Sequence, residues 1–326
     1  MSALTLVEAV RTALARAMEE DPRVLVLGED VGRDGGVFRA TEGLFERFGP
    51  ERVLDTPLSE ALFTGLAVGL GAQGFRPVVE FQFDGFMYPA IDQLVNHAGR
   101  LRARTRGRLS CPIVLRAPYG AGIRAPEHHS ESPEALFAAI PGVRTVIPSS
   151  PAKAYGLLLA AIRDPDPVVF LEPKRIYRAF REEVVDDGVA LPLDRAFVLR
   201  EGRDLTIVAW GALVREALQA AERLAEEGVS AEVLDPATLA PLDAETILAA
   251  VARTGRCLIV HEAPPSHGPG AEIAALLAAE GLFSLLAPVA RVTAFDLPTP
   301  LPRLEGVFLP NVADILEAAR RLLAHR

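Results

Sequence analysis

The chain has 326 residues, half of them apolar, and a formal net charge of −9; this length predicts about two domains, and the acidic balance argues against a nucleic-acid-binding protein, which would usually be basic. The longest apolar runs, such as 66–72, are far shorter than the roughly 20 residues that a membrane span needs, which argues against a membrane protein. The N-terminal segment has no basic region followed by an apolar core and carries Glu8 and Glu19, so we expect no targeting peptide and a cytoplasmic location.

Short apolar runs alternate with helical patterns along the first half of the chain. Thr5 and Glu8 have the spacing of a capping box, which predicts that a helix begins there. Apolar strands are expected at 24–27, 53–54, 77–81, 112–116, 143–147 and 167–171. Further helices are expected at 42–48, from Ser59 onward, at 89–104, from Ser132 onward and at 151–163. This alternation predicts an α/β fold with a parallel sheet that is covered by helices on both faces.

The segment from Lys174 to Asp204 interrupts this alternation. It is rich in charged residues and contains Pro192, so we expect it to cross the surface as a linker, with 174–178 exposed or at an interface. A second alternating unit follows, with strands expected at 204–210, 229–234, 257–260 and 289–295 and helices at 212–227, 243–253, 271–280 and 312–324. We therefore expect two α/β domains, 1–185 and 200–326, joined by a linker at 186–199.

Polar residues follow several of the predicted strands of the first domain. Glu29, Glu60 and Gln82 come after successive strands, and a loop with two histidines (117–132) follows the next. In open parallel sheets ligands bind beyond the carboxyl ends of the strands, so we expect these groups to converge on one site.

Glu60 stands at the start of a nearly all-apolar helix that we expect to be buried, because helices that are apolar all round are buried. An acid beside such a surface tends to keep its proton near neutral pH, which suits acid–base chemistry. The alternative is that Ser59 caps the helix and Glu60 only favours its positive end. Taken alone, these residues favour the alternative, whereas the convergence at the sheet edge favours the chemical role.

Several other site classes find no support in the sequence. His128 and His129 are consecutive, so in an extended loop they would point opposite ways, and no metal-binding spacing such as H-E-x-x-H occurs. Cys111 and Cys257 lie in strand-like runs and are expected to be buried free thiols. Neither a G-x-S-x-G nucleophile elbow nor a nucleotide P-loop is present. The arginine run at 100–108 is expected to be a solvated helix end or a subunit contact.

A series of motifs nevertheless resembles one family over nearly the whole chain, the β subunits of 2-oxo acid dehydrogenases. The matching motifs are Gly28-Glu-Asp-Val-Gly32, Asp55-Thr-Pro-Leu-Ser-Glu60, Phe81-Gln-Phe83, Asp92-Gln93, His129-Ser130, Asp164-Pro-Asp-Pro-Val-Val-Phe-Leu-Glu-Pro173 and His261-Glu-Ala-Pro264. Within the family, 129–134 and 170–178 look most like the branched-chain (2-oxoisovalerate) type, and the pyruvate type is the runner-up.

The resemblance implies a transketolase-like fold, with a pyrimidine-binding parallel-sheet domain followed by a transketolase C-terminal α/β domain. It implies a thiamine diphosphate enzyme that works as an α2β2 heterotetramer with an α subunit. Such an enzyme decarboxylates a branched-chain 2-oxo acid oxidatively, as in branched-chain amino acid degradation. It then passes the acyl group to a lipoyl domain of the acyltransferase core, in the manner of an acyl-transferring, lipoamide-dependent dehydrogenase.

The resemblance also implies roles for individual residues. Glu60 matches the acid that hydrogen-bonds the pyrimidine ring nitrogen and so activates the cofactor, and Phe86 matches the aromatic ring that stacks on the pyrimidine. Leu58 and Gln82 match its other neighbours, and His129 matches a histidine near the reacting carbon that orients the lipoyl group. Four further positions match residues that bind a monovalent cation, such as K⁺, in relatives: Ile113, Ala161, Asp164 and Asp166.

One family feature is missing, and a few positions depart from the family pattern. Thiamine enzymes hold the diphosphate through Mg²⁺ on a Gly-Asp-Gly…Asn segment, and this chain contains no Gly-Asp pair. We therefore expect the α subunit to hold the diphosphate and Mg²⁺, with the site between the two chains. A non-catalytic scaffold and a self-contained transketolase-like enzyme are the alternatives, and the missing segment disfavours the second. Glu131 stands where relatives commonly have Gln, Glu127 adds a further acid before the histidines, and 296–306 is less familiar.

Overall fold

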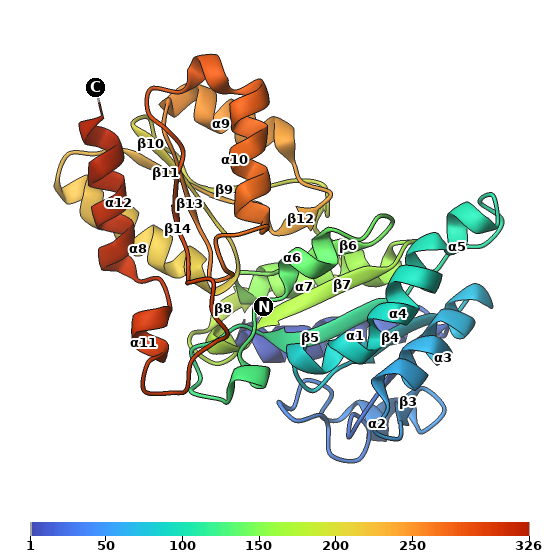
Figure 1. Ribbon diagram of the computed structural model, residues 1–326. Coiled ribbons are helices and arrows are strands. Elements are labelled where there is room, and N and C mark those ends of the chain that lie inside the picture. The colour runs from blue at the N-terminus through green and yellow to red at the C-terminus, as the bar shows by residue number, and fades with distance from the viewer. Residues whose placement is uncertain (1, 326) are drawn as a thin grey trace.

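A seven-stranded sheet forms the centre of the first half of the chain in the computed structural model, which describes residues 2–325 (Figure 1). Its strand order is β12-β6-β7-β5-β4-β2-β3. The strands are β2 (Val24–Gly28), β3 (Val53–Asp55), β4 (Arg76–Glu80), β5 (Val114–Tyr119), β6 (Arg144–Val146), β7 (Val168–Pro173) and β12 (Thr238–Ala240). All neighbours pair in parallel except β12, which comes from the second half of the chain and pairs antiparallel with β6. The predicted parallel sheet is confirmed.

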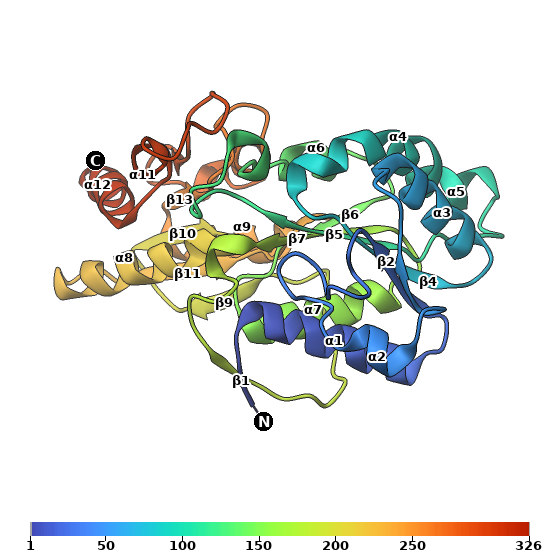
Figure 2. The same ribbon diagram turned by 90° about the horizontal axis from the view of Figure 1, so that it is seen from below.

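Helices cover both faces of this sheet, as Figure 2 shows. Helices α1 (Leu6–Glu20) and α7 (Pro151–Arg163) lie together on one face, and α3 (Glu60–Ala72), α4 (Ile91–Gln93), α5 (Gly99–Arg104) and α6 (Glu134–Ala138) lie on the other. A short α2 (Leu44–Phe48) precedes β3. The strands are buried on both faces because the helices shield them from water. The capping box is confirmed, since the Thr5 N–H donates to the Glu8 carboxylate at 2.8 Å.

The second half of the chain forms a five-stranded sheet in the order β14-β13-β10-β11-β9. Its strands are β9 (Phe197–Arg200), β10 (Leu205–Ala209), β11 (Ala231–Asp235), β13 (Cys257–Val260) and β14 (Ala290–Val292). Only β9 runs antiparallel to its neighbour. Helices α8 (Val214–Glu226), α9 (Ala244–Thr254), α10 (Pro269–Glu280), α11 (Glu305–Phe308) and α12 (Val312–Ala324) surround it (Figure 1). The predicted second α/β unit is therefore present.

The segment after β7 differs from the surface linker that we expected. Lys174, Ile176 and Tyr177 are buried, and a strand, β8 (Glu182–Val184), pairs antiparallel with β1 (Ser2–Leu4). Strands β1, β8, β9 and β12 were missed because each is at most four residues long and carries no clear apolar alternation. Burial of Lys174 depends on a partner far away in the sequence, which the charge of the segment does not reveal.

Helix α3 is not buried all round, contrary to the sequence expectation. Its inner face buries Phe63, Thr64, Ala67 and Gly71. The outer face exposes Leu62 and Leu66, and Leu58 just before the helix is 80% exposed. Helix α3 follows the edge strand β3, and within residues 2–325 no other element covers Leu62 and Leu66 on its outer face. The predicted cap is also wrong in part: Ser59 holds the N-cap position, but its side chain makes no capping hydrogen bond.

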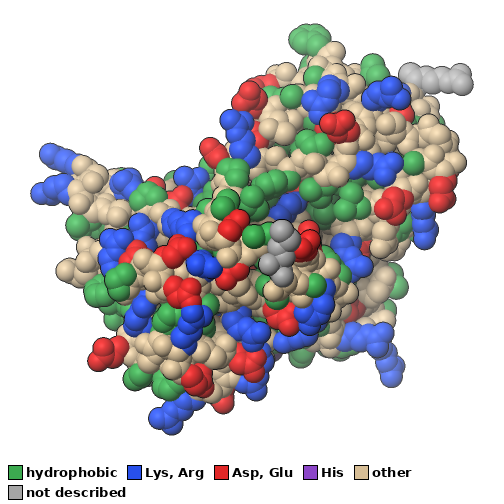
Figure 3. All heavy atoms as spheres, turned by 180° about the vertical axis from the view of Figure 1, so that it is seen from behind, with side chains coloured by type: hydrophobic (Ala, Val, Ile, Leu, Met, Phe, Trp, Pro, Cys, Tyr) green, Lys and Arg blue, Asp and Glu red, His purple; other side chains and the backbone are tan. Residues whose placement is uncertain are grey.

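The surface carries charges of both signs. Figure 3 shows Lys and Arg side chains interspersed with Asp and Glu side chains on one face, not a patch of one sign. The arginines at 100–108 are all exposed, as expected for a solvated helix end. Cys111 and Cys257 are buried and free, which confirms their predicted state. Within residues 2–325, no helix has the length and apolar character that crossing a bilayer requires.

Candidate active site

The polar groups singled out in the sequence lie at one edge of the large sheet. Glu29 follows β2, Glu60 follows β3, Gln82 follows β4, and the loop with the two histidines follows β5. These four strands are neighbours in the order β5-β4-β2-β3, and all are parallel, so their carboxyl ends meet at the same edge. The predicted convergence is therefore present in the structure.

One half of the site is formed by acids around the start of α3. Glu60 is the first residue of α3 and is half-buried. Burial, and next the negative charge of Glu60, raise the pKa of the neighbouring Glu29. Glu29 Oε1 and Thr56 Oγ1 are buried and have no hydrogen-bond partner within the chain. Beside them, Gln82 Nε2 donates to Asp30 Oδ2 at 3.1 Å. This half therefore presents polar atoms that a bound group could still satisfy.

The other half of the site is a cluster of aromatic rings around His129. The His129 ring centroid lies 4.4 Å from that of Phe83 and 5.2 Å from that of Phe86, both in edge-on arrangements. The ring of His128 also lies against Phe86, at 5.5 Å. The expectation that the two histidines point opposite ways is wrong, because 127–129 forms a 3₁₀ turn instead of an extended strand.

His129 has the properties of a neutral base. Burial, followed by the positive charges of His128 and Lys174, lowers the pKa of the imidazole below its ordinary value. The ring therefore stays neutral at pH 7 and can accept a proton. Its Nδ1 is buried and has no hydrogen-bond partner within the chain. His129 can thus take part in proton transfer with a group that enters the site.

Beneath the aromatic cluster lies an ion pair that the sequence analysis missed. Lys174 Nζ lies 3.2 Å from Asp84 Oδ1, and both side chains are buried. Burial raises the pKa of Asp84 to about 7 even though Lys174 opposes the shift, and burial lowers the pKa of Lys174. Asp84 and Lys174 each follow a buried strand, β4 and β7, and that shared placement is the sequence signal that could have found them.

A second buried ion cluster lies at the ends of the central strands. Arg116 on β5 pairs with Glu80 on β4 and with Glu172 on β7, where its Nε lies 2.7 Å from Oε1. The Tyr177 hydroxyl donates to Glu172 Oε2 at 2.6 Å. Because charges in such a place need partners, this cluster ties the three strand ends together beneath the site. The unusual Glu131 also has a partner, since the Tyr88 hydroxyl donates to its carboxylate.

The four residues proposed for a monovalent cation lie at the other end of the strands. Arg76 Nη1 donates to the carbonyl oxygens of Ile162 and Asp164 at 2.8 and 3.2 Å. Arg144 lies 2.9 Å from the Asp164 carboxylate, and Arg102 donates to that of Asp166 at 2.6 Å. The Ile113 and Ala161 carbonyls accept backbone N–H groups. Guanidinium groups thus contact the carboxylates of Asp164 and Asp166 and the Asp164 carbonyl, and the assignment of these four residues to a cation stays a prediction.

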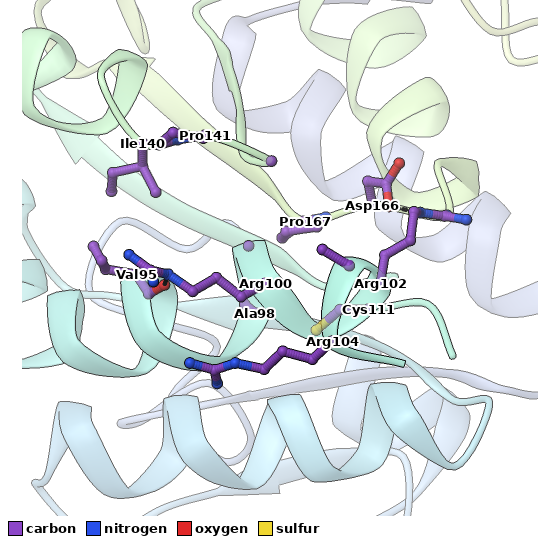
Figure 4. Close-up of a pocket in the computed structure, with 13 residues that line it drawn as sticks. Val95, Ala98, Arg100, Arg102, Arg104, Cys111, Ile140, Pro141, Asp166 and Pro167 are labelled. Carbon is purple, nitrogen blue, oxygen red and sulfur yellow. Dashed lines mark hydrogen bonds and ion pairs between the residues drawn. The ribbon is translucent and has the colours of Figure 1, made fainter. Parts of the chain in front are cut away.

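A cavity of about 750 Å³ is also at that far end (Figure 4). Its lining includes Val95, Ala98 and Ile140, with Arg100 and the Arg102–Asp166 pair at its rim. Cys111 and Pro167 precede β5 and β7, so this cavity lies at the amino ends of the strands and not beside Glu60 or His129. No cluster of three or more His, Cys, Asp or Glu side chains in residues 2–325 is arranged to hold a metal ion.

Two known families match successive parts of the chain. Residues 2–179 match the transketolase pyrimidine-binding domain, and residues 194–315 match the transketolase C-terminal domain. The structure is also similar to a solved structure described as a split-gene transketolase in an inactive β4 tetramer, with a TM-score of 0.82, 24% identity and 99% of each chain covered. The transketolase-like fold expected from the sequence is confirmed.

Curated proteins match the full length of the chain. A pyruvate dehydrogenase E1 component subunit beta from Acholeplasma laidlawii is 48% identical, with 100% of both chains covered. The protein of that name from Bacillus subtilis is 49% identical, with 99% of both chains covered. A 2-oxoisovalerate dehydrogenase subunit beta from Bacillus subtilis is 47% identical, also with 99% of both covered.

Proposed function

The chain belongs to the family of β subunits of 2-oxo acid dehydrogenases, and on this premise we propose that it supplies the pyrimidine-binding half of a thiamine diphosphate site. An α subunit completes that site in an α2β2 heterotetramer. The reaction is the oxidative decarboxylation of a 2-oxo acid, followed by transfer of the acyl group to a lipoyl domain of the acyltransferase core. Thiamine diphosphate, when bound, supplies the stabilisation of negative charge at carbon that decarboxylation requires.

The residues at the sheet edge fit the pyrimidine end of this cofactor. The Glu60 carboxyl would hold the pyrimidine ring nitrogen by a hydrogen bond, and the buried unpaired Glu29 Oε1 offers a further polar contact. The Phe86 ring is fixed between Phe83 and the two histidines and offers a face for stacking. Leu58 and Gln82 would cover the remaining edges of the ring.

The observation that carries the proposal is the uncovered apolar surface beside Glu60. Leu58, Leu62 and Leu66 are all exposed next to this acid. Apolar side chains gathered on one face usually mark a contact with another molecule. An α subunit on this face would remove water from around Glu60, and it would bring the Gly-Asp-Gly…Asn segment for Mg²⁺ and the diphosphate. Residues 1–185 and 200–326, joined by 186–199, are the domains that we propose for this arrangement.

His129 is the group that we place at the acyl-transfer step. Its neutral imidazole, held edge-on against Phe83 and Phe86, can orient the incoming lipoyl group and exchange a proton with it. A monovalent cation at Ile113, Ala161, Asp164 and Asp166 stays part of the proposal, and it would have to compete with the arginines that contact Asp164 and Asp166.

Two acyl specificities compete. The branched-chain type is favoured by the motifs at 129–134 and 170–178, whereas the pyruvate type is favoured by the identity of 49% to the Bacillus subtilis protein, against 47% to its 2-oxoisovalerate counterpart. Such similar identities do not separate the two. Because the α subunit would share the substrate pocket, the choice has to be measured on the assembled enzyme.

The test is reconstitution with an α chain that carries the Gly-Asp-Gly…Asn segment. The mixture should decarboxylate a 2-oxo acid with an artificial electron acceptor, and neither chain should do so alone. The ratio of kcat/KM for 2-oxoisovalerate to that for pyruvate then assigns the specificity. A properly assembled tetramer that decarboxylates neither acid would refute the proposed function.

A further inference from the structure

The loop that carries both histidines is held by the second half of the chain. This histidine loop (120–133) leaves β5 and enters α6, and it closes on itself where the Gly120 N–H donates to the Glu131 carbonyl at 2.8 Å. In addition, its backbone N–H groups at 121, 122 and 124 donate to carboxylates of the second half of the chain. The position of the loop therefore depends on those carboxylates.

The first carboxylate is that of Glu262, two residues after β13. Its Oε1 accepts the Ala121 N–H at 2.7 Å and the Ser132 hydroxyl at 3.0 Å, so it joins the two ends of the histidine loop. Glu262 is buried. A buried carboxylate is costly unless hydrogen bonds compensate it, and these two bonds provide that compensation.

The second carboxylate is that of Glu305, the first residue of α11. Its Oε1 accepts the Gly122 N–H at 2.9 Å and the Arg124 N–H at 3.1 Å. Glu305 is also buried. Nearby, the Thr299 hydroxyl donates to the Ser130 carbonyl at 2.9 Å, directly after His129. Glu262, Glu305 and Thr299 of the second half thus hydrogen-bond the histidine loop on both sides of the two histidines.

The contact between the histidine loop and the second half borders a cavity. A cavity of about 310 Å³ lies between the histidine loop and the 297–299 segment, lined by Glu131, Ser132 and Thr299 among others. The backbone conformation of the loop at position 122 requires glycine. Gly122 has a φ of +98°, and a Cβ at this position would collide with the Arg175 side chain. Because Glu305 accepts two backbone N–H groups of the loop, the loss of its carboxylate should loosen the loop.

We propose that Glu262 and Glu305 are positioning residues whose carboxylates hold the histidine loop so that His129 stays against Phe83 and Phe86. Neither is among the residues proposed to contact the cofactor, so their effect would pass through His129. This inference rests on the proposed function, since it assigns acyl transfer to His129. By holding the histidine loop, the second domain would affect the reaction without supplying a catalytic residue.

The test compares Glu305→Met with Glu305→Gln in the reconstituted α2β2 enzyme. Met removes both acceptor oxygens, whereas Gln keeps one oxygen that can accept the Gly122 N–H. In the Met variant, hydrogen exchange of the amides at 121–124 should accelerate, and kcat for acyl transfer to a lipoyl domain should fall by about 10²-fold. Decarboxylation with an artificial acceptor and its KM should change far less, and Gln should restore most of the transfer rate. The exposed Glu280→Met is the charge-matched control and should change nothing.

Each outcome decides the proposal. If hydrogen exchange of the amides at 121–124 is unchanged in the Met variant, Glu305 does not hold the histidine loop. If exchange is faster but the rate of acyl transfer is unchanged, Glu305 does not position His129. Equal losses of transfer and decarboxylation, or no rescue by Gln, would show a structural role alone and would also overturn the positioning role. If the Met variant fails to assemble, Thr299→Val serves in its place. It should lower the rate of acyl transfer more than the rate of decarboxylation, by a smaller factor than expected for the Met variant. A wild-type tetramer without decarboxylation would refute the proposed function, and the exchange experiment would still test whether Glu305 holds the histidine loop.

Discussion

The two halves of the candidate site differ in how completely groups of this chain surround the residue at their centre, Glu60 or His129. Around His129 the chain supplies two aromatic rings, a buried Lys174–Asp84 pair beneath them and a loop held by the second domain, and His129 Nδ1 is left without a partner. Around Glu60 the chain leaves polar atoms without partners and an apolar helix face open. This difference is the reason why we place the proposed contact with an α subunit on the Glu60 half of the site.

The largest effect is expected from Glu60→Gln in the reconstituted tetramer. A glutamine cannot exchange a proton with the pyrimidine ring, so decarboxylation with an artificial acceptor should fall by about 10²–10⁴-fold. The exposed Glu51→Gln, near the start of the strand that leads to Glu60, should keep full activity. Near-normal turnover of Glu60→Gln would support the alternative of a non-catalytic scaffold and would leave Glu60 with its helix-start role only.

Removing the buried cation beneath the histidine half should cost stability. Lys174→Met leaves Asp84 without its partner, so the free energy of unfolding should fall by about 3–5 kcal/mol at pH 8. The loss should be smaller at pH 5, because the pKa of Asp84 is already raised to about 7 and the acid is then neutral. Chemical denaturation at both values checks this. The Asp84→Asn, Lys174→Met double variant should recover part of the loss, and no recovery would contradict the pairing.

Replacing His129 should separate the two steps of the reaction. His129→Ala should lower the rate of acyl transfer to a lipoyl domain by about 10²-fold and leave decarboxylation with an artificial acceptor nearly intact. His128→Ala is a matched control, since its side chain is largely exposed and lies against the same Phe86 ring. Equal losses in both steps, or an equal effect of His128→Ala, would show that the His129 assignment is wrong.

A smaller effect concerns Glu134, which follows the histidine loop and accepts the Trp210 Nε1–H at 3.1 Å. Burial raises its pKa from 4.5 to about 7. Its contribution to stability is therefore fully present below pH 4.5 and is lost as the pH rises through 7.

Glu134→Gln should flatten this decline by up to about 1.4 kcal/mol per pH unit between pH 5 and 7. Denaturation of both proteins across that range measures the difference, because the other titrating groups are common to both. The exposed Glu222→Gln should leave the slope unchanged. Parallel curves for wild type and Glu134→Gln would contradict the buried, proton-holding state of this acid.

Much of the fold could be predicted because it depends on local patterns. Apolar runs such as 24–28 are buried on both faces, and the order of strands and helices predicts a parallel sheet whose carboxyl ends gather Glu29, Glu60, Gln82 and the histidine loop. The family resemblance added the roles of single residues, which remain proposals. The short strands β1 and β8 escaped prediction because they are paired only through tertiary structure.

The parts of the site that escaped prediction are contacts between distant segments. Lys174 looks like a surface residue until Asp84, 90 positions earlier, is placed beside it. Glu262 and Glu305 reach the histidine loop from the second domain. The apolar composition of α3 predicted burial on all sides, which is wrong for this chain, because composition does not say which face another element covers. Here the outer face of α3 is left open.

We propose above that Glu60 belongs to one half of a cofactor site whose other half is on the α subunit. Calorimetric titration of thiamine diphosphate with Mg²⁺ tests it most directly, first into this chain alone and then into the reconstituted α2β2 tetramer. We expect tight, Mg²⁺-dependent binding to the tetramer and none to the single chain. Tight, Mg²⁺-dependent binding to the single chain would contradict it.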